Sequence, residues 1–346
     1  MKNFLLSSNG ETTGIAMRLE DEGHPTRMFV TGDRSKYAGH NIITTEATWR
    51  PVIPWADLVI VNGILPPAAK AMLADNIGLA FGLDGQHFVD RGIPSGAATL
   101  SFVAFWTGRG WMMPVFPFVS AREQLSGDLG AVVGEMGVAI WPHRDPVPEP
   151  VHRVMQKFGN ENLKNTDYRG MVVFYMFDLG NGLETGYVRA ETDMALLSPI
   201  LELSTSTCLD FFADIAGSRG VNIETREDVA LSAHLSVPPW PWVASDGVWM
   251  DKSFTVEPGA ESHLWLCDVG RSGVDVSYET GFTGKLGYAT SRAKFGTRIS
   301  RRFREVSRRL DRVISGVYCD SLQYRNDLTE ILYQKFTSVE EQWQTT

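Results

Sequence analysis

One stretch of this sequence combines glycines with carboxylates at a spacing that could bind a small substrate. It reads SGDLGAVVGEMGVAIWP, residues 126–142, with Asp128 near its start and Glu135 within it. Its glycines allow positive φ angles and the close approach of a ligand to the backbone. A carboxylate beside an amine can orient the amine and take up its proton. The same composition is typical of a flexible surface loop, so the residue types alone leave both interpretations open.

A second polar stretch, SSNGETTG at residues 7–14, lies between a predicted strand and a predicted helix. The N-terminus of such a helix can bind a phosphate through its backbone N–H groups, which makes Asn9 and Gly10 candidate substrate-binding residues. An ordinary strand-to-helix turn is the alternative. The stretch lacks a complete G-x-G-x-x-G pattern, so we do not expect a dinucleotide site.

A basic segment, residues 292–312, carries nine basic side chains against Glu305 and Asp311. These charges are typical of the solvated face of a helix. The alternative is a surface that contacts phosphate or nucleic acid. No pattern of aromatic residues for stacking accompanies the basic residues, so nucleic acid is not the expected partner. Apolar residues at helical spacing predict an amphipathic helix that packs inward through Phe303, Val306, Leu310 and Val313.

Composition excludes several classes of protein. The chain has 346 residues, 43% of them hydrophobic, and a formal net charge of −9, which argues against a protein whose whole surface binds nucleic acid or an acidic membrane. It contains three cysteines, without zinc spacing, so we expect a reducing, cytoplasmic setting. No run of 18 apolar residues predicts a membrane span, and the first residues are too few for a signal peptide. His143 is expected in a surface loop, and no hydrolase or zinc motif is present.

The order of predicted elements indicates a mixed protein, α/β followed by α+β. NFLL at 3–6 and DLVIVNG at 57–63 read as buried strands with helices between and after them, which predicts a small layer of parallel strands. From about residue 97 the sequence becomes rich in β-branched and aromatic residues, with a hairpin turn at 107–110 and a second around 181–182. After Gly217 the chain is β-rich until the basic helix.

Four motifs, in order, resemble the phosphoribosylamine–glycine ligases and related ATP-grasp enzymes. TLSFVAFWTGRGWMMPVFPF at 99–118 resembles the hairpin that precedes their substrate loop, and the stretch at 126–142 is similar to that loop itself. GLETGYVRAETDMALLSPILEL at 182–203 resembles the strand and helix that carry metal ligands in this family. YRNDL at 324–328 is similar to its closing Y-R-x-D-I motif.

This resemblance implies a domain organisation, an activity and a set of site residues. It implies an N-terminal Rossmann-like domain at 1–80, a reduced ATP-grasp body at 81–216 and a β-rich portion with the basic helix at 217–346. The implied activity is ATP-dependent joining of a carboxylate to an amine, with a small carboxylate or amine as substrate. The implied residues are Asp128 and Arg122 for catalysis, Glu184 for a metal, and, for the substrate, Gly127, Gly134, Met136 and Gly137, together with Asn9 and Gly10.

The chain departs from the family pattern at several positions. Ala131, Val132 and Val133 replace a polar Pro-Asn-Thr, and Gly186 falls on a metal-binding Asn, which leaves Glu184 as a weak magnesium site on its own. Thirty residues separate Pro66 from Ala97, whereas a nucleotide-binding lobe of several strands and helices needs roughly 65.

We therefore expect residues 67–96 to form a helix and connecting chain, so that the first nucleotide-binding lobe is missing. Mg-ATP is then expected to bind weakly or not at all, with a Kd no better than about 1 mM, unless a partner chain completes the nucleotide site. The alternative function is that of a catalytically inactive relative which acts as a binding or structural component. If the glycine-rich stretch holds a ligand, Asp128 is expected in a cleft shared with Glu184 and the 98–118 hairpin.

Overall fold

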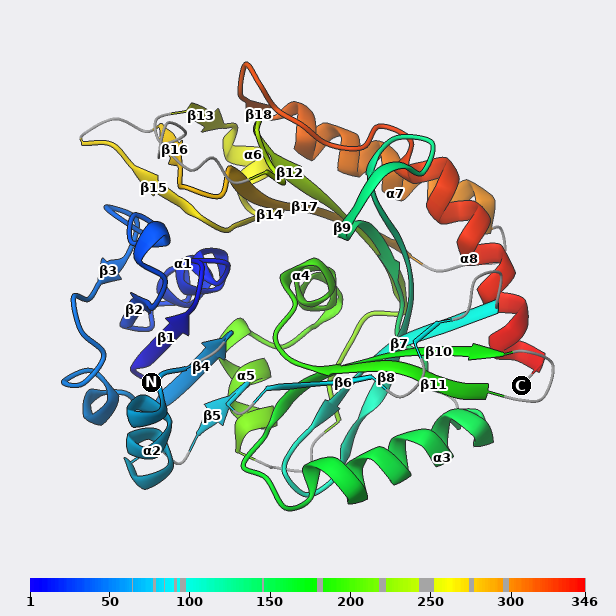
Figure 1. The fold of residues 1–346 in the computed structure, drawn as a ribbon. Coiled ribbons are helices and arrows are strands. Elements are labelled where there is room, and N and C mark those ends of the chain that lie inside the picture. Colours follow the sequence, from blue (N-terminus) through cyan, green and yellow to red (C-terminus); the bar gives the residue numbers. More distant parts are fainter. Residues whose placement is uncertain are drawn as a thin grey trace.

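A computed structural model describes most of this chain as a mixed α/β protein (Figure 1). The described residues are 1–63, 65–76, 79–83, 85–89, 92–93, 98–144, 146–178, 183–217, 222–242, 252–273, 277–294 and 299–345. No helix in these ranges is long and apolar enough to cross a bilayer.

The N-terminal part is a parallel sheet with strand order β3-β2-β1-β4-β5. Its strands are β1 (Asn3–Ser7), β2 (Thr26–Val30), β3 (Thr44–Thr45), β4 (Leu58–Asn62) and β5 (Ala80–Phe81). Every residue of β1 and β4 is buried, as the continuous apolar runs predicted. Helices α1 (Thr13–Asp21) and α2 (Pro67–Asn76) and the 3₁₀ turns η1 (Asp33–Ser35) and η2 (Ile53–Trp55) connect the strands.

A large antiparallel sheet follows, in the order β14-β17-β12-β9-β8-β7-β10-β11-β6. The long hairpins are β7 (Ala98–Trp106) with β8 (Trp111–Leu125), β8 with β9 (Leu129–Ile140), and β10 (Gly170–Asp178) with β11 (Leu183–Ala190). The first hairpin turns at 107–110, where Thr107 N–H donates to the Gly110 carbonyl, as predicted. The turn predicted around 181–182 lies outside the described residues. The remaining strands of this sheet are β6 (Gln86–Val89), β12 (Asp228–Ser236), β14 (Leu264–Leu266) and β17 (Lys285–Lys294).

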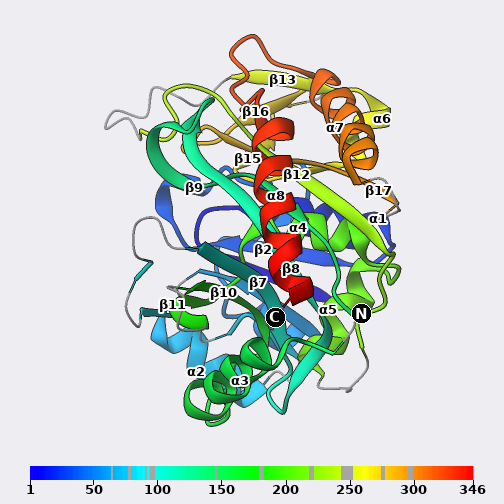
Figure 2. The same ribbon diagram turned by 90° about the vertical axis from the view of Figure 1, so that its right-hand side faces the viewer.

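Helices cover both faces of the large sheet. On the outer face lie α3 (Glu149–Phe158), the π-helical turn η3 (Gly159–Leu163), α7 (Ile299–Ser315) and α8 (Leu328–Thr345). Figure 2 shows α8 running along this face, where it contacts β8 and β9. The inner face holds α4 (Met194–Leu203) and α5 (Cys208–Ala216), and α4 lies between the large sheet and the N-terminal part (Figure 1).

The C-terminal part adds a small sheet in the order β15-β16-β13-β18, with β15 (Val269–Arg271), β16 (Tyr278–Thr280), β13 (Ser253–Val256) and β18 (Val317–Tyr318), beside the short helix α6 (Pro258–Glu261). The inward face of the basic helix is confirmed, because the side chains named for it are all buried.

Two regions bear on the predicted domain organisation. Within residues 67–96, the described part holds α2, β5 and β6, and these two short strands extend the N-terminal sheet and the large sheet. From the portion after residue 217, strand β12 pairs with β9 of the large sheet, and β17 pairs with β12. The predicted boundary at 216/217 therefore runs within one continuous hydrogen-bonded sheet.

Candidate functional site

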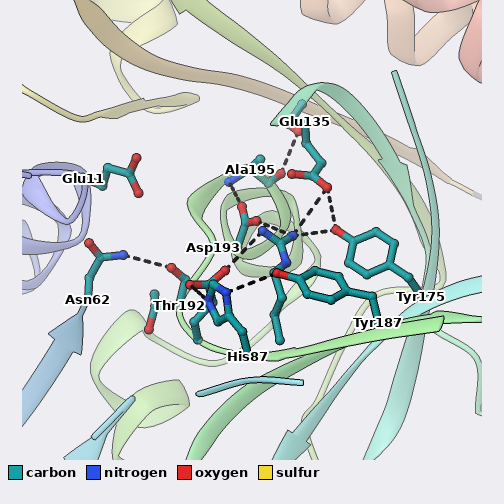
Figure 3. Close-up of polar contacts among 12 residues, drawn as sticks. Glu11, Asn62, His87, Glu135, Tyr175, Tyr187, Thr192, Asp193 and Ala195 are labelled. Atoms are coloured by element: carbon teal, nitrogen blue, oxygen red, sulfur yellow. Dashed lines mark hydrogen bonds and ion pairs between the residues drawn. The ribbon is translucent and has the colours of Figure 1, made fainter. Parts of the chain in front are cut away.

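A polar cleft of about 260 Å³ lies where the N-terminal sheet meets the inner face of the large sheet. Its walls come from the carboxyl ends of β1 and β4 on one side, and from β9, β11, β12, β17 and the start of α4 on the other. Figure 3 shows Glu11 and Asn62 facing Glu135, Tyr175 and Asp193 across this space. We call it the central cleft. Ligands of open parallel sheets bind at the carboxyl ends of the strands.

Arg189, on β11, is the centre of a buried charge network. Its Nη2 lies 2.5 Å from the Tyr175 hydroxyl, 2.8 Å from Asp193 Oδ2 and 3.4 Å from Glu135 Oε1. Its Nη1 lies 3.2 Å from Glu191 Oε1. Tyr175 in turn donates to Glu135 Oε1 at 2.5 Å. The guanidinium thus holds three carboxylates from β9, the end of β11 and the N-terminus of α4 in fixed positions.

Lys285, on β17, forms the second cationic point. Its Nζ donates to Glu11 Oε1 at 2.6 Å and to the Tyr288 hydroxyl at 3.1 Å. Burial alone would lower the pKa of Lys285, but the Glu11 carboxylate outweighs it and holds the pKa well above its usual value. Burial would raise the pKa of Glu11, and the adjacent Lys285 instead brings it below its usual value. Both groups are therefore charged at neutral pH.

Carboxylates outnumber cations in this cleft. Its described lining includes Glu11, Glu135, Glu191 and Asp193 against Arg189 and Lys285, four negative groups against two positive ones. Burial, and repulsion from the neighbouring acids, raise the pKa of Asp193 to about 6 despite the opposing effect of Arg189. The cleft therefore has an excess of negative charge, which favours a cationic ligand over an anionic one.

The loop at 7–14 holds Glu11 in the cleft. Ser7 Oγ accepts from Gly10 N–H at 3.0 Å, and Asn9 Oδ1 accepts from Glu11 N–H at 3.3 Å. Gly10 has a φ of 78°, and a Cβ there would lie 2.3 Å from the Ala38 side chain, so only glycine fits. Asn9, a candidate substrate-binding residue from the sequence, lines the cleft, and Gly10 forms the turn that follows it.

A neutral histidine closes one end of the cleft. His234, on β12, packs against Trp240 with ring centroids 4.3 Å apart and ring planes tilted by 40°, and burial lowers the pKa of His234 well below the usual value. Neither ring nitrogen has a hydrogen-bond partner in the described structure. His234 therefore adds a donor and an acceptor to the site without adding charge.

The structure places Asp128 away from the central cleft. Asp128 lies in the tight turn between β8 and β9, where it and Gly127 have φ angles of 54° and 73°. Its Oδ1 accepts from the buried Arg325 at 2.9 Å, and Gly127 N–H donates to Asp327 Oδ2 at 2.7 Å. The YRNDL segment thus clamps the hairpin turn, and the described residues that line the cleft do not include Asp128.

Glu184 belongs to a different cavity. It lines a space of about 480 Å³ between β6, β11 and α3, together with Lys157, Glu161 and the apolar Phe88. None of the cavities described for this part of the chain is lined by both Asp128 and Glu184, and the hairpin turn brings Asp128 to Arg325 of the C-terminal segment instead. Within the described ranges, no group of three His, Cys, Asp or Glu side chains is placed to hold a metal.

The other predicted site residues divide between the cleft and the scaffold. Gly134 and Met136, on β9, line the central cleft. Arg122, on β8, lies beside it, with its guanidinium 5.7 Å from the centre of the Tyr175 ring. Gly137 instead packs against α8, because a Cβ there would lie 2.3 Å from the Leu328 side chain.

The sequence offered uneven signals for the cleft residues it did not assign. Glu11 and Glu135 lie inside the two polar stretches, and Arg189 and Asp193 lie inside the segment at 182–203. The motifs therefore contain all four of these residues, although the sequence did not single them out. Lys285 and His234 are single polar residues on strands, so no local pattern marks them.

Comparison with known proteins supports the fold but not a family. No protein-family model matches the sequence, and no curated protein matches it either. Among solved structures, phosphoribosylamine–glycine ligase from Thermotoga maritima matches with a TM-score of 0.66 at 12% identity, covering 94% of this chain and 100% of that one.

Two further solved structures match over similar lengths. The biotin carboxylase subunit of pyruvate carboxylase has a TM-score of 0.53 at 8% identity, over 98% of this chain and 99% of that one. N5-carboxyaminoimidazole ribonucleotide synthetase from Thermotoga maritima has a TM-score of 0.51 at 10% identity, over 94% and 100%. The chain therefore has the ATP-grasp fold, and at these identities the likeness shows the fold alone.

Proposed function

We propose that this protein binds a small primary amine in the central cleft, as a non-catalytic relative of the ATP-grasp carboxylate–amine ligases. The observation that carries the proposal is the excess of two carboxylates over cations in that cleft. An ammonium group entering the cleft would gain carboxylate partners that are already desolvated and held in place by Arg189. Charge-assisted hydrogen bonds of this kind are stronger than neutral ones.

An anionic substrate is disfavoured by the same contacts. The cations of the cleft are already engaged, Lys285 with Glu11 and Arg189 with Asp193, Glu135 and Glu191. A phosphate or carboxylate would have to displace these partners and leave buried carboxylates uncompensated, which is costly.

The span at 67–96 supports a role without ATP chemistry. Its described residues supply one helix and two short edge strands, which offers little material for a lobe that could close over a nucleotide. Glu184 lies in a separate cavity, and the described residues do not form a metal cluster. A partner chain that supplies the missing lobe would restore nucleotide binding only in the complex.

An active carboxylate–amine ligase is the second candidate, favoured by the raised pKa of Asp193 in the cleft. In that reaction the γ-phosphoryl group of ATP passes to a carboxylate, giving an acyl phosphate and ADP. The amine nitrogen then attacks the carbonyl carbon, phosphate leaves, and a base takes the amine proton. The raised pKa of Asp193, about 6, is suited to accepting a proton near neutral pH.

The experiment is a calorimetric titration with ethanolamine, glycine and putrescine, each compared with a neutral or amine-free analogue such as ethylene glycol or glycolate. We expect an amine to bind at least about tenfold more tightly than its analogue, or about 1.4 kcal/mol. Equal affinities, or no amine binding at about 10 mM, would refute the proposal.

A second assay separates the two candidates. Release of ADP is measured with Mg-ATP, a bound amine and a panel of small carboxylates. Amine binding without ADP release supports the non-catalytic proposal. Release of ADP that requires the amine and is lost in Asp193→Asn would instead establish the ligase.

A further inference from the structure

A cavity of about 560 Å³ lies beside the basic helix α7, with walls from α7, β17 and the short helix α6. Helix α7 contacts both of these elements (Figure 1). No described residue lines both this cavity and the central cleft. Its volume lies within the range of roughly 300–1,000 Å³ that is usual for small-molecule sites. We call it the arginine cavity, after the three arginines in its lining, Arg292, Arg309 and Arg312.

The three arginines reach the cavity from two elements. Arg292 lies on β17, whereas Arg309 and Arg312 lie one turn apart on α7. Arg309 Nη1 donates to the Arg292 carbonyl oxygen at 2.9 Å, which ties the helix to the strand at the cavity wall. The side chains of Arg292 and Arg309 are 34% and 45% exposed, and Arg312 is exposed as well. All three therefore line the cavity while keeping surface that a dissolved ligand can contact.

Positive charge exceeds negative charge in the described lining. The three arginines stand against one carboxylate, Glu257, which accepts from the Tyr318 hydroxyl. The remaining titratable side chain is His263, whose Nδ1 lies 3.0 Å from Glu202 Oε1. The arginine cavity therefore has the opposite charge balance to the central cleft, and it attracts an anion.

Two of the arginines are available to a ligand. Arg292 pairs at 2.8 Å with Asp228, whose side chain is only 8% exposed, so breaking this pair would be costly. Arg309 pairs at 2.7 Å with Glu305, but the Glu305 side chain is 38% exposed, so water can hydrate it when a ligand takes its place. Arg312 has no carboxylate partner among the described residues, and its Nε donates to a backbone carbonyl at 3.4 Å. Arg309 and Arg312 can therefore bind an anion without leaving a buried charge unpaired.

The chemistry of the walls favours a phosphate attached to a small organic group. Guanidinium groups present pairs of N–H donors that match the oxygens of a phosphate, and a phosphate carries more charge than a carboxylate. The same cavity is lined by the apolar Ala260 and Val313. A Cβ on Gly259 would have no atom within 4 Å, so open space borders this glycine. The cavity thus combines cationic side chains with apolar wall and room for an organic group.

We propose that the arginine cavity binds a small phosphomonoester. Arg309 and Arg312 would donate to the phosphate oxygens, Arg292 would add positive potential, and the organic group would lie against Ala260 and Val313. This gives a role to the basic segment at 292–312, which the central cleft does not use. The proposal does not depend on amine binding in the central cleft, because the two spaces share no described residue.

The test uses the wild-type chain and calorimetric titration at about 20 mM salt, where screening of the arginines is weak. The probes are glucose 6-phosphate and glycerol 3-phosphate, and glucose and glycerol are their matched uncharged controls. We expect a phosphomonoester to bind with a Kd below about 1 mM and at least about tenfold more tightly than its parent alcohol. Inorganic phosphate should bind more weakly than the phosphomonoester, because it lacks the organic group.

Variants locate the binding. Arg309→Gln and Arg312→Gln should each weaken phosphomonoester binding at least about fivefold, because each removes a charged donor. Arg153→Gln is the matched control, since Arg153 is an exposed helical arginine that pairs with Glu149 in the same i,i+4 relation, at 3.5 Å, but lies on α3 outside the cavity. It should leave the affinity unchanged. All three variants should melt close to the wild type, because exposed ion pairs contribute little to stability.

Two results would overturn the site itself. The first is no binding of either phosphomonoester at about 10 mM. The second is binding that neither Arg309→Gln nor Arg312→Gln alters, which would place the ligand elsewhere.

Three further results would overturn the ligand or the role of the cavity. Arg308 is exposed on α7 but does not line the cavity, so an equal loss in Arg308→Gln and Arg309→Gln would mean that the whole helix face attracts anions. Inorganic phosphate that binds as tightly as the phosphomonoester would make the free anion the ligand. A single-stranded oligonucleotide that binds more tightly than the phosphomonoester, and is weakened by the same variants, would make this face a nucleic-acid surface.

Discussion

Asp193→Asn should change how the stability of this protein depends on pH. Asp193 begins α4, where its Oδ1 accepts from Ala195 N–H at 3.0 Å and its Oδ2 lies 2.8 Å from Arg189. Asparagine can keep the capping bond, since its side-chain oxygen accepts in the same position. The substitution therefore removes mainly the charge.

The magnitude follows from the raised pKa. A carboxyl group whose pKa rises from 3.8 to about 6 on folding stabilises the folded state most when it is protonated. That contribution is fully present below pH 3.8 and is lost as the pH rises through 6. The whole span corresponds to about 3 kcal/mol, of which about 1 kcal/mol falls between pH 5 and pH 7. Wild-type stability should therefore decrease over this interval by about that amount relative to Asp193→Asn.

Urea denaturation followed by tryptophan fluorescence, at half-unit steps from pH 5 to pH 7, measures this difference. The pKa of Asp268 is also raised to about 6, chiefly by burial, but Asp268 is present in both proteins, so its titration cancels. Parallel pH profiles for the two proteins would show that Asp193 titrates normally. The excess of negative charge inferred for the central cleft would then be wrong.

Three other outcomes follow from the structure. Arg325→Ala should lower the free energy of unfolding by about 1.5–3 kcal/mol in urea denaturation, because it removes the charged hydrogen bonds from Arg325 to Asp327 and Asp128. Gly137→Ala should destabilise the folded protein by about 1–3 kcal/mol, since the new Cβ would clash with Leu328. The Cβ of Gly134→Ala would have no atom within 4 Å, so this variant should be destabilised only by its φ of 109°. Thermal denaturation of both variants compares the two effects. Mg-ATP should bind the isolated chain with a Kd no better than about 1 mM by calorimetry, and micromolar binding would revive the ligase.

Local patterns predicted those parts of the fold whose cause is local. Buried parallel strands read as continuous apolar runs at 3–6 and 57–63, and the hairpin turn at 107–110 carries its own glycines. The basic helix shows its apolar stripe in the sequence. The pairing of β6 with β11, and of β12 with β9, joins segments about 100 residues apart, and no local pattern specifies which distant strand is the partner.

Some of the candidate residues named from the sequence lie in the central cleft and others do not, again because local patterns carry only part of the information. Asn9, Gly134 and Met136 line the central cleft, because Asn9 follows the end of β1 and the other two lie on β9, which forms part of the opposite wall. Asp128 misled the prediction because a glycine followed by an aspartate also suits a tight turn with positive φ, which is the role the structure gives it. Only the spatial partner, Arg325, distinguishes the two roles, and it is distant in sequence.

Binding of ethanolamine to Glu135→Gln and Asp128→Asn tests the central claim most directly. Glutamine keeps an oxygen that can accept from Tyr175 but removes one of the cleft's excess charges, whereas Asp128 lies outside the cleft. The amine-binding account predicts that Glu135→Gln weakens ethanolamine binding about tenfold and that Asp128→Asn leaves it unchanged. Equal affinities for wild type and Glu135→Gln, or a larger loss in Asp128→Asn, would contradict it.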